Sequence, residues 1–415
     1  MNKKNGVKNK FISLFACVVI IIMIYDCNSI FTAGTHSNIL NRLTSYIMIL
    51  SVLILITLSY NSTIEISQYI INVSIITIYL IIYILIQRNQ GAFQFGFTYL
   101  IRFILMFSLA YFVCQNHEIT LFINIYINLI TLIAIISLFF WLFGSVLNFV
   151  HPNQSYLSIW TGNYESVPSY FNVYFETQKL DSTIRNSAIF TEAPMASLSF
   201  SIALILEVLY SKIKKFHLCR VIILVLAVLS TLSSTGYIFL ILLMGYIMLI
   251  RKNGNYMNAI KLVLVPVIMF ILILLVRSVL NRKLVTSSGF ERSKDFVNSF
   301  KAWVKYPIIG LGINTGQSSK DVANWDIGSF GYSTSFGKIL GENGIYILIL
   351  YLISAVKSFY IGIQQKDTNR IFITIMMIYL FVLTLFANTY LIFFIFSVMY
   401  IYQFKTNIYS DYKTY

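Results

Sequence analysis

Long apolar runs, separated by short polar segments, recur along the whole chain. Each run has about 15 to 25 residues, and a helix of that length, rising about 1.5 Å per residue, spans a hydrocarbon core of about 30 Å. The strands of a membrane barrel are shorter and alternate between apolar and polar residues, so they do not fit these runs. The pattern predicts an all-α fold: a polytopic membrane helix bundle in which residues 1–415 form a single membrane domain.

We place about twelve transmembrane helices along the sequence. They lie near Phe11–Tyr25, Leu43–Tyr60, Ile66–Ile86, Phe95–Cys114, Ile119–Leu147, Ala188–Tyr210, Leu218–Leu232, Thr235–Ile250, Ile260–Leu280, Ile339–Gly362, Ile371–Phe386 and Thr389–Phe404. The two that meet near Ser233 could instead be one broken helix. Lysines precede Phe11 as in a secretory signal, but no convincing cleavage site follows, so we expect a retained first helix.

Basic residues gather in short segments between the apolar runs. Threading the helices from a cytoplasmic amino terminus places the clusters at 212–215, 251–252 and 366–370 on one side, while the short loops opposite hold almost none beyond Arg42 and Arg88. By the positive-inside rule we expect both termini to be cytoplasmic. The same distribution accounts for the net charge of +15, so we expect no nucleic-acid partner.

Composition supports a membrane protein, because 58% of the residues are apolar and only 11% are charged. An ordinary soluble domain has about a quarter of its residues charged. Four histidines are scattered over different loops, and four cysteines lie far apart. Neither set has the spacing of metal ligands, so we expect no metal, no cofactor and free thiols.

Two connections, 151–187 and 281–338, are much longer than the others, and the threading places both on the outer face. Polar loops longer than about 15 residues are usually functional or disordered. Both loops carry aromatic residues, among them Trp160 and Trp303, which argues against disorder. We therefore expect the candidate functional site in these two long outer loops.

An amphipathic helix is expected in the second long loop, near 289–306. Phe296, Phe300 and Trp303 recur on one face, while lysines occupy the others. Such a helix is suited to lie on a membrane surface or to cap a cavity. Pro307 ends it, and the glycines that follow, at Gly310, Gly312 and Gly316, match no nucleotide-binding fingerprint and suggest a tight re-entry of the chain.

Arg292 falls in the first turn of this helix, where the helix dipole disfavours a cation unless an anion is also present. Helix-start amides and a guanidinium together suit a phosphate group, and Arg282, Lys283 and Lys294 lie nearby in sequence. The alternative is that these are solvated charges that flank a surface helix.

Ionisable residues within or beside the apolar runs are further candidates. Glu192 follows Arg185 closely at a helix entrance, where Pro194 removes a backbone donor and is expected to open the backbone towards a cavity. Interfacial snorkelling is the alternative for Glu192. Arg102 lies deep in an apolar run and is expected to act inside the bundle. Glu207, like Lys357, lies towards a cytoplasmic end, and we expect both of these to anchor their helices.

The chain resembles the O-antigen polymerase and O-antigen ligase superfamily of bacterial membrane glycosyltransferases. The resemblance rests on the span count, the two enlarged loops and a set of local motifs in order. The motifs are the Arg-to-Glu-Ala-Pro segment Arg185–Pro194, the sequence Gly289-x-x-Arg292 followed by Trp303 and Pro307-x-x-Gly310-x-Gly312, and the segment Leu340–Ile345.

The resemblance implies an enzyme that polymerises oligosaccharide repeat units on the outer face of the bacterial cytoplasmic membrane, making O-antigen or capsular polysaccharide. The donor would be an oligosaccharide on undecaprenyl pyrophosphate, and the acceptor a sugar hydroxyl of a second lipid-linked unit. Transfer would need no metal. The implied partners are membrane lipids, together with a chain-length regulator and a flippase of the same pathway.

Roles follow for particular residues. Arg185, Glu192 and Arg292 would be catalytic, the arginines stabilising the leaving pyrophosphate and Glu192 taking the acceptor proton. Glu342 is the second candidate for the proton acceptor. The expected substrate-binding residues are Arg282, Lys294, Trp303, Lys305, Arg102 and Glu342.

Alternatives remain within and outside the superfamily. Ligases carry a histidine that the resemblance would place near Tyr332–Ser335, and no histidine follows His217, so the sequence favours a polymerase over a ligase. A flippase or other transporter of lipid-linked oligosaccharide is the main rival, because it also needs many spans. Transporters usually show internal repeats and midplane sites, for which Arg102 is the main candidate here.

Overall fold

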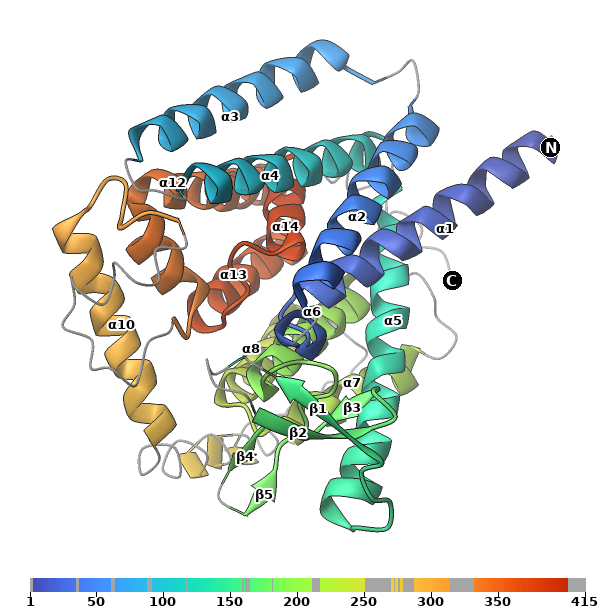
Figure 1. The fold of residues 1–415 in the computed structure, drawn as a ribbon. Helices are drawn as coiled ribbons and strands as arrows, with labels where there is room; N and C mark the ends of the chain where they lie inside the picture. Colours follow the sequence, from blue (N-terminus) through green and yellow to red (C-terminus); the bar gives the residue numbers. More distant parts are fainter. Residues whose placement is uncertain are drawn as a thin grey trace. The chain divides into compact units, whose positions relative to one another are not determined.

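The computed structural model describes residues 3–34, 37–60, 64–87, 92–116, 118–158, 160, 165–180, 182–210, 217–250, 270–271, 273–274, 277–278, 287–313 and 332–401. Helices dominate these residues (Figure 1). They are α1 (Lys3–Asp26), α2 (Ser37–Ser59), α3 (Ile66–Ile86), α4 (Ala92–Gln115), α5 (Ile119–Phe140), α6 (Ala193–Tyr210), α7 (His217–Ser230), α8 (Ser234–Ile250), α10 (Ser287–Lys305), α12 (Ser335–Gln364), α13 (Thr368–Leu383) and α14 (Tyr390–Ile401). A 3₁₀ turn covers Ile30–Ala33, and a π-helical turn, η2 (Trp141–Val146), extends α5.

Seven helices of the described chain are long and apolar enough to cross a membrane: α1 to α4, α5 together with η2, α6 and α12. Four shorter apolar helices, α7, α8, α13 and α14, match further predicted spans. The multi-pass helical fold is confirmed. The predicted span Ile260–Leu280 lies mostly outside the described residues, so the number of crossings stays a prediction.

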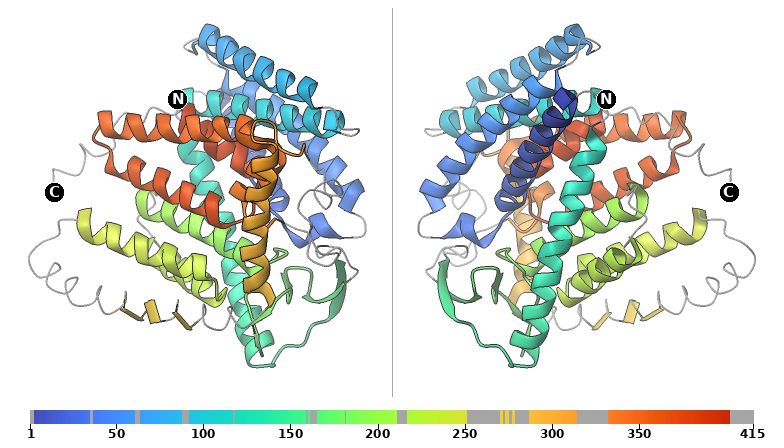
Figure 2. Two further views of the ribbon diagram at one scale, coloured as in Figure 1. Left: turned by 90° about the vertical axis from the view of Figure 1, so that its left-hand side faces the viewer. Right: turned by 90° about the vertical axis from the view of Figure 1, so that its right-hand side faces the viewer.

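The chain divides into two compact units. The first comprises residues 1–19, 48–119 and 294–415. Within it α4 packs against α3 and α14, and α12 packs against α13 and α14, which Figure 2 shows side by side. The outward faces of these helices are apolar, as at Ile71 and Ile75 of α3, which suits contact with lipid.

The second unit comprises residues 20–47 and 120–293. Here α6 packs against α7 and α8, and its residues from Ala193 to Ile205 are all buried. α7 and α8 are separate helices, because Leu232 between them has a φ of 48°, outside the helical region.

Short strands in the first long loop were not predicted. β1 (Gln154–Ser158), β2 (Glu165–Tyr170) and β3 (Tyr174–Phe175) form an antiparallel sheet in that order, and β4 (Lys179–Leu180) pairs with β5 (Thr183–Ile184). The described part of this loop therefore has regular structure, in line with the argument from its aromatic residues against disorder.

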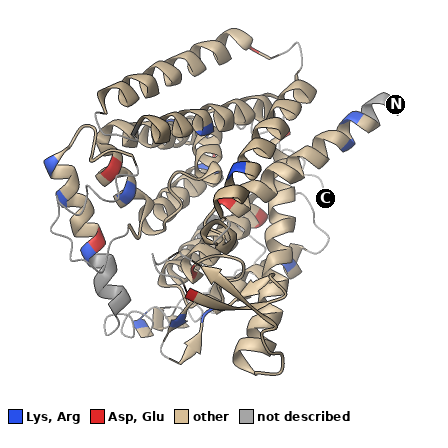
Figure 3. Ribbon diagram, viewed as in Figure 1, with Lys and Arg blue, Asp and Glu red and all other residues tan. Residues whose placement is uncertain are grey.

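Charged residues are sparse on the long helices and recur along α10 (Figure 3). This contrast agrees with the sequence pattern: apolar helices for a membrane, and one amphipathic helix in the second long loop.

Candidate functional site

Arg185 and Glu192 are brought together at the start of α6. Gln178 connects them, because its Oε1 accepts hydrogen bonds from Arg185 Nη1 at 3.0 Å and from the backbone amide of Ala193 at 3.1 Å. Arg185 Nε also donates to the carbonyl of Thr231, between α7 and α8, at 2.9 Å. Only 6% of Arg185 is exposed, so its guanidinium is held firmly within the second unit.

Glu192 lies immediately before α6 and is half-buried. Its Oε1 accepts a hydrogen bond from the indole Nε1 of Trp160 at 2.9 Å, and its carbonyl accepts from the amides of Met195 and Ala196. The first turn of α6 is therefore regular. The expectation that Pro194 opens the backbone is wrong, because a proline in the first turn removes an amide that has no partner within the helix.

The second constellation joins the segment after α10 to a break in α12. α12 is interrupted at Gly344, whose φ is 66°. The broken helix leaves carbonyls and amides without helical partners, and the segment 307–312 satisfies them. Leu311 and Gly312 donate to the carbonyls of Gly341 and Glu342 at 3.0 and 2.7 Å.

In the opposite direction, the amides of Ile345 and Tyr346 donate to the carbonyls of Pro307 and Ile308, each at 3.0 Å. The two backbones cross so closely that a Cβ on Gly310 would meet the backbone of Glu342, and one on Gly344 would meet the carbonyl of Ile308. Both glycines also have positive φ, so only glycine fits either position without strain. Gly310 is one of the three glycines for which the sequence suggested a tight path; Gly316 lies outside the described residues.

Glu342 lies at this crossing and is 5% exposed. Tyr83 of α3 and Tyr332 lie near its carboxylate. Burial, with further contributions from Glu342 and Asp295, raises the pKa of Tyr332 above its usual range, so this phenol stays neutral at physiological pH.

α10 has the amphipathic arrangement that the sequence predicts. Its small residues Asn298, Ser299 and Ala302 are buried, and Ser299 faces Gly337 at the start of α12. The apolar stripe is exposed, with side chains from Phe296, Val297, Phe300 and Val304. An exposed apolar stripe on an otherwise polar helix is the geometry of a helix at a membrane surface.

The expected ligand-binding residues of the second loop are spread along this segment. The indole Nε1 of Trp303 donates to the carbonyl of Pro307 at 3.1 Å; Lys294 is half-buried and Lys305 is exposed. Arg292 belongs to α10, but its side chain lies outside the described residues, as do Arg282 and Lys283.

Arg102 lies in α4, and its guanidinium reaches the start of α14. Nη1 donates to the carbonyl of Asn388 at 3.0 Å, and the guanidinium carbon lies 4.6 Å from the centre of the Tyr390 ring. Arg102 therefore contacts protein inside the bundle of the first unit.

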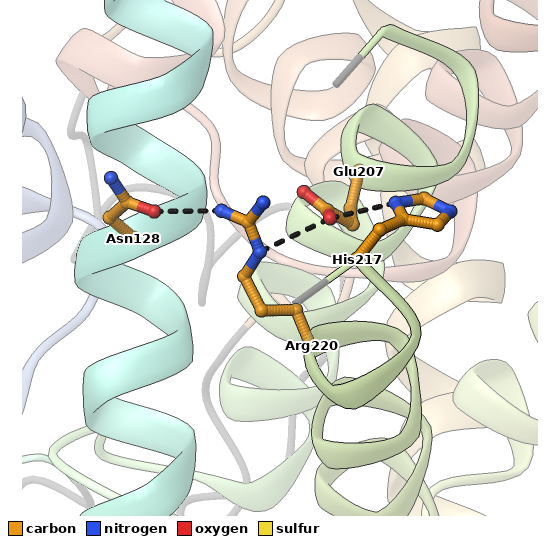
Figure 4. Close-up of polar contacts among 4 residues, drawn as sticks. All are labelled: Asn128, Glu207, His217 and Arg220. Carbon is orange, nitrogen blue, oxygen red and sulfur yellow. Dashed lines mark hydrogen bonds and ion pairs between the residues drawn. The ribbon is translucent and has the colours of Figure 1, made fainter. Parts of the chain in front are cut away.

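Glu207 corrects a sequence expectation. It does not anchor α6 at a membrane surface, because it is fully buried. Its Oε1 lies 2.9 Å from Nδ1 of His217 and 3.2 Å from Nε of Arg220, and Arg220 Nη1 donates to Asn128 of α5 at 2.9 Å (Figure 4). No local pattern in the sequence predicts this cluster, since its members lie on three helices.

Among the described residues no three His, Cys, Asp or Glu side chains lie close enough together to hold a metal ion. Comparisons of the chain with family models, curated proteins and solved structures found no match.

Proposed function

We propose that this protein is a metal-independent membrane glycosyltransferase that polymerises oligosaccharide repeat units carried on undecaprenyl pyrophosphate. It would act on the outer face of the bacterial cytoplasmic membrane, with both termini in the cytoplasm, and make O-antigen or capsular polysaccharide. Lipid-linked units are its proposed substrates. A flippase that delivers them and a chain-length regulator are its proposed partners.

The observation that carries the proposal is the junction of α10 with the break in α12. A substrate with a polar head and a long apolar tail needs a site where polar backbone and charged side chains meet a membrane surface. The apolar stripe of α10 is exposed, and the segment that follows α10 makes four backbone hydrogen bonds to the polar break at Gly344, an arrangement that suits such a boundary.

In the proposed reaction a sugar hydroxyl attacks the anomeric carbon of the donor, and the lipid pyrophosphate leaves. Negative charge grows on the pyrophosphate, and arginine guanidinium groups stabilise it through paired hydrogen bonds. Arg292 and Arg282 are the proposed contacts in the second long loop. Arg185, just before α6, is a further proposed contact of the pyrophosphate. Its hydrogen bonds to Gln178 and to the carbonyl of Thr231 fix the orientation of its guanidinium.

The test is deletion of the gene, followed by analysis of lipid-linked and surface glycans. A polymerase predicts accumulated single repeat units and loss of long chains. Purified protein should then extend these isolated units without added metal. Normal long chains in the deletion strain would overturn the proposal, and lost chains without any extension by the purified protein would favour a transporter.

A further inference from the structure

The carboxyl end of α3, which the predicted topology places on the outer side, contacts the broken helix α12 within the first unit. The phenol of Tyr83 donates to Asn343 Oδ1 at 3.3 Å and lies 3.4 Å from the carbonyl of Ile309. Just beyond α3, Gln87 Oε1 accepts from the amide of Ile313 at 3.4 Å. Polar side chains from the end of α3 and from α12, together with backbone groups of the segment after α10, thus lie beside the break.

Asn343 is fully buried, and its Nδ2 has no hydrogen-bond partner among the residues that the structure describes. A buried donor without a partner has lost its hydrogen bond to water and gained none in return, which destabilises the folded state. Such exceptions are rare in folded proteins and call for an explanation, of which a ligand group is one. The Asn343 amide therefore points to a missing acceptor atom.

Glu342 is the neighbour of Asn343 and is itself almost fully buried, with Tyr83 near both side chains. The remaining part of α12, from Ile345 to Gln364, is long enough to span about 30 Å by itself. Glu342 and Asn343 then lie at the outer end of the span. Non-helical backbone at such a depth is tolerated where it is buried in protein or lines a polar cavity.

We infer that Glu342 and Asn343 form the acceptor-sugar subsite of the proposed polymerase. The Asn343 amide donates to an oxygen of the acceptor sugar, and the Glu342 carboxylate takes the proton of the attacking hydroxyl. The inference rests on the proposed function and identifies its second substrate position.

The step balances without a further reactant. The acceptor oxygen forms a bond to the donor anomeric carbon, and the bond from that carbon to pyrophosphate breaks with its electron pair on the phosphate oxygen. The hydroxyl proton passes to Glu342 and later to water. We favour Glu342 over Glu192, the alternative base, because Glu342 lies next to Asn343, whose amide has no hydrogen-bond partner among the described residues and can orient a sugar.

The test uses the purified full-length protein in lipid nanodiscs, with single lipid-linked repeat units extracted from the deletion strain as the probe. Glu342→Gln should lower the turnover rate by about 10² to 10⁴-fold, the usual contribution of a general base. Glu342→Asp keeps the carboxylate and should retain at least about tenfold more activity than the Gln variant. Asn343→Ala should raise the KM for the units more than it lowers kcat.

Glu118→Gln is the matched control, because it removes another carboxylate from the first unit. Glu118 follows the carboxyl end of α4 and accepts a hydrogen bond from the hydroxyl of Ser59, the last residue of α2. It should keep the parent rate. If the parent does not extend the units, the proposed function fails and this inference with it. If the parent is active and folded Glu342→Gln works within about twofold of it, the inference alone fails. If the Gln variant does not fold, an Asn343→Ala variant with the parent KM and kcat overturns the subsite.

Discussion

Removing the carboxylate of Glu207 should destabilise the second unit more than any exposed substitution. Glu207 is 0% exposed, and its carboxylate lies within ion-pair distance of Arg220 and His217. Arg220 in turn donates a hydrogen bond to Asn128 (Figure 4). The cluster ties α5, α6 and α7 together. Glu207→Ala deletes the carboxylate that His217 and Arg220 share and leaves the Arg220 guanidinium at a largely buried position.

The expected cost follows from burial. Breaking a buried ion pair by removing one partner costs about 3–5 kcal/mol, because the other charge stays buried without compensation. The Arg220 side chain is only 11% exposed, so water replaces little of the lost contact. We expect a loss of about 3 kcal/mol, the lower end, since Asn128 still accepts from Arg220. His217 is 33% exposed, and His217→Ala should cost under about 1 kcal/mol.

Reversible unfolding by SDS in mixed micelles measures these differences. Glu165→Ala, at an exposed position on β2, is the control and should stay within about 0.5 kcal/mol of the parent. The Glu207→Ala/Arg220→Ala double variant should lose less than the sum of the single variants, because it leaves no uncompensated charge. A Glu207→Ala cost as small as the control, or strict additivity, would refute the reasoning.

Three further predictions test the re-entry, the anion site and the topology. Gly344→Ala puts a Cβ against the carbonyl of Ile308 at a position with positive φ, and it should sharply reduce the folded yield in size-exclusion chromatography. Gly245→Ala is the control and should be tolerated, because its added Cβ would meet open space. Arg292→Lys keeps the charge but loses paired hydrogen bonds, so surface chains should shorten at normal expression; unchanged chain length would exclude the role. In a cysteine-free background, Ser166→Cys should react with an impermeant thiol reagent in intact cells, and labelling only after membrane rupture would reverse the topology.

Helices could be predicted well because their signal is local. An apolar run of sufficient length specifies a span whatever its neighbours are, and the stripe of Phe296, Phe300 and Trp303 specifies an amphipathic helix in the same way. The tight path after Pro307 was partly visible too, since closely spaced glycines permit positive φ and close backbone approach. The break in α12 was not, because Ile339–Gly362 was expected to be one continuous span. The partner segment of each glycine was not visible, because it lies about 30 residues away in the chain.

The first long loop shows why the rest could not be predicted. The span expected from Ala188 begins as a helix only at Ala193, since the preceding residues bond elsewhere. Asn186 Nδ2 donates to Ser230, and the Ser187 hydroxyl donates to the carbonyl of Phe175. These contacts join segments far apart in sequence, and they hold Arg185 where Gln178 and Thr231 can reach it. Tertiary contacts of this kind override local apolar preference.

The contrast between local sequence signals and tertiary contacts also explains how the two candidate carboxylates, Glu192 and Glu342, differ. Glu192 stands out in the sequence because it is a charge at a helix entrance, yet its carboxylate is already used by Trp160 and its helix turn is regular. Glu342 is less conspicuous between two glycines that fit a plain turn. In the folded chain Gly344 breaks α12, and the segment after α10 forms backbone hydrogen bonds at the break. Glu342 is buried at this crossing, next to Asn343, whose amide has no partner among the described residues. We therefore rank Glu342 above Glu192 for the proposed proton transfer, because a buried ionisable group beside irregular backbone is typical of functional sites.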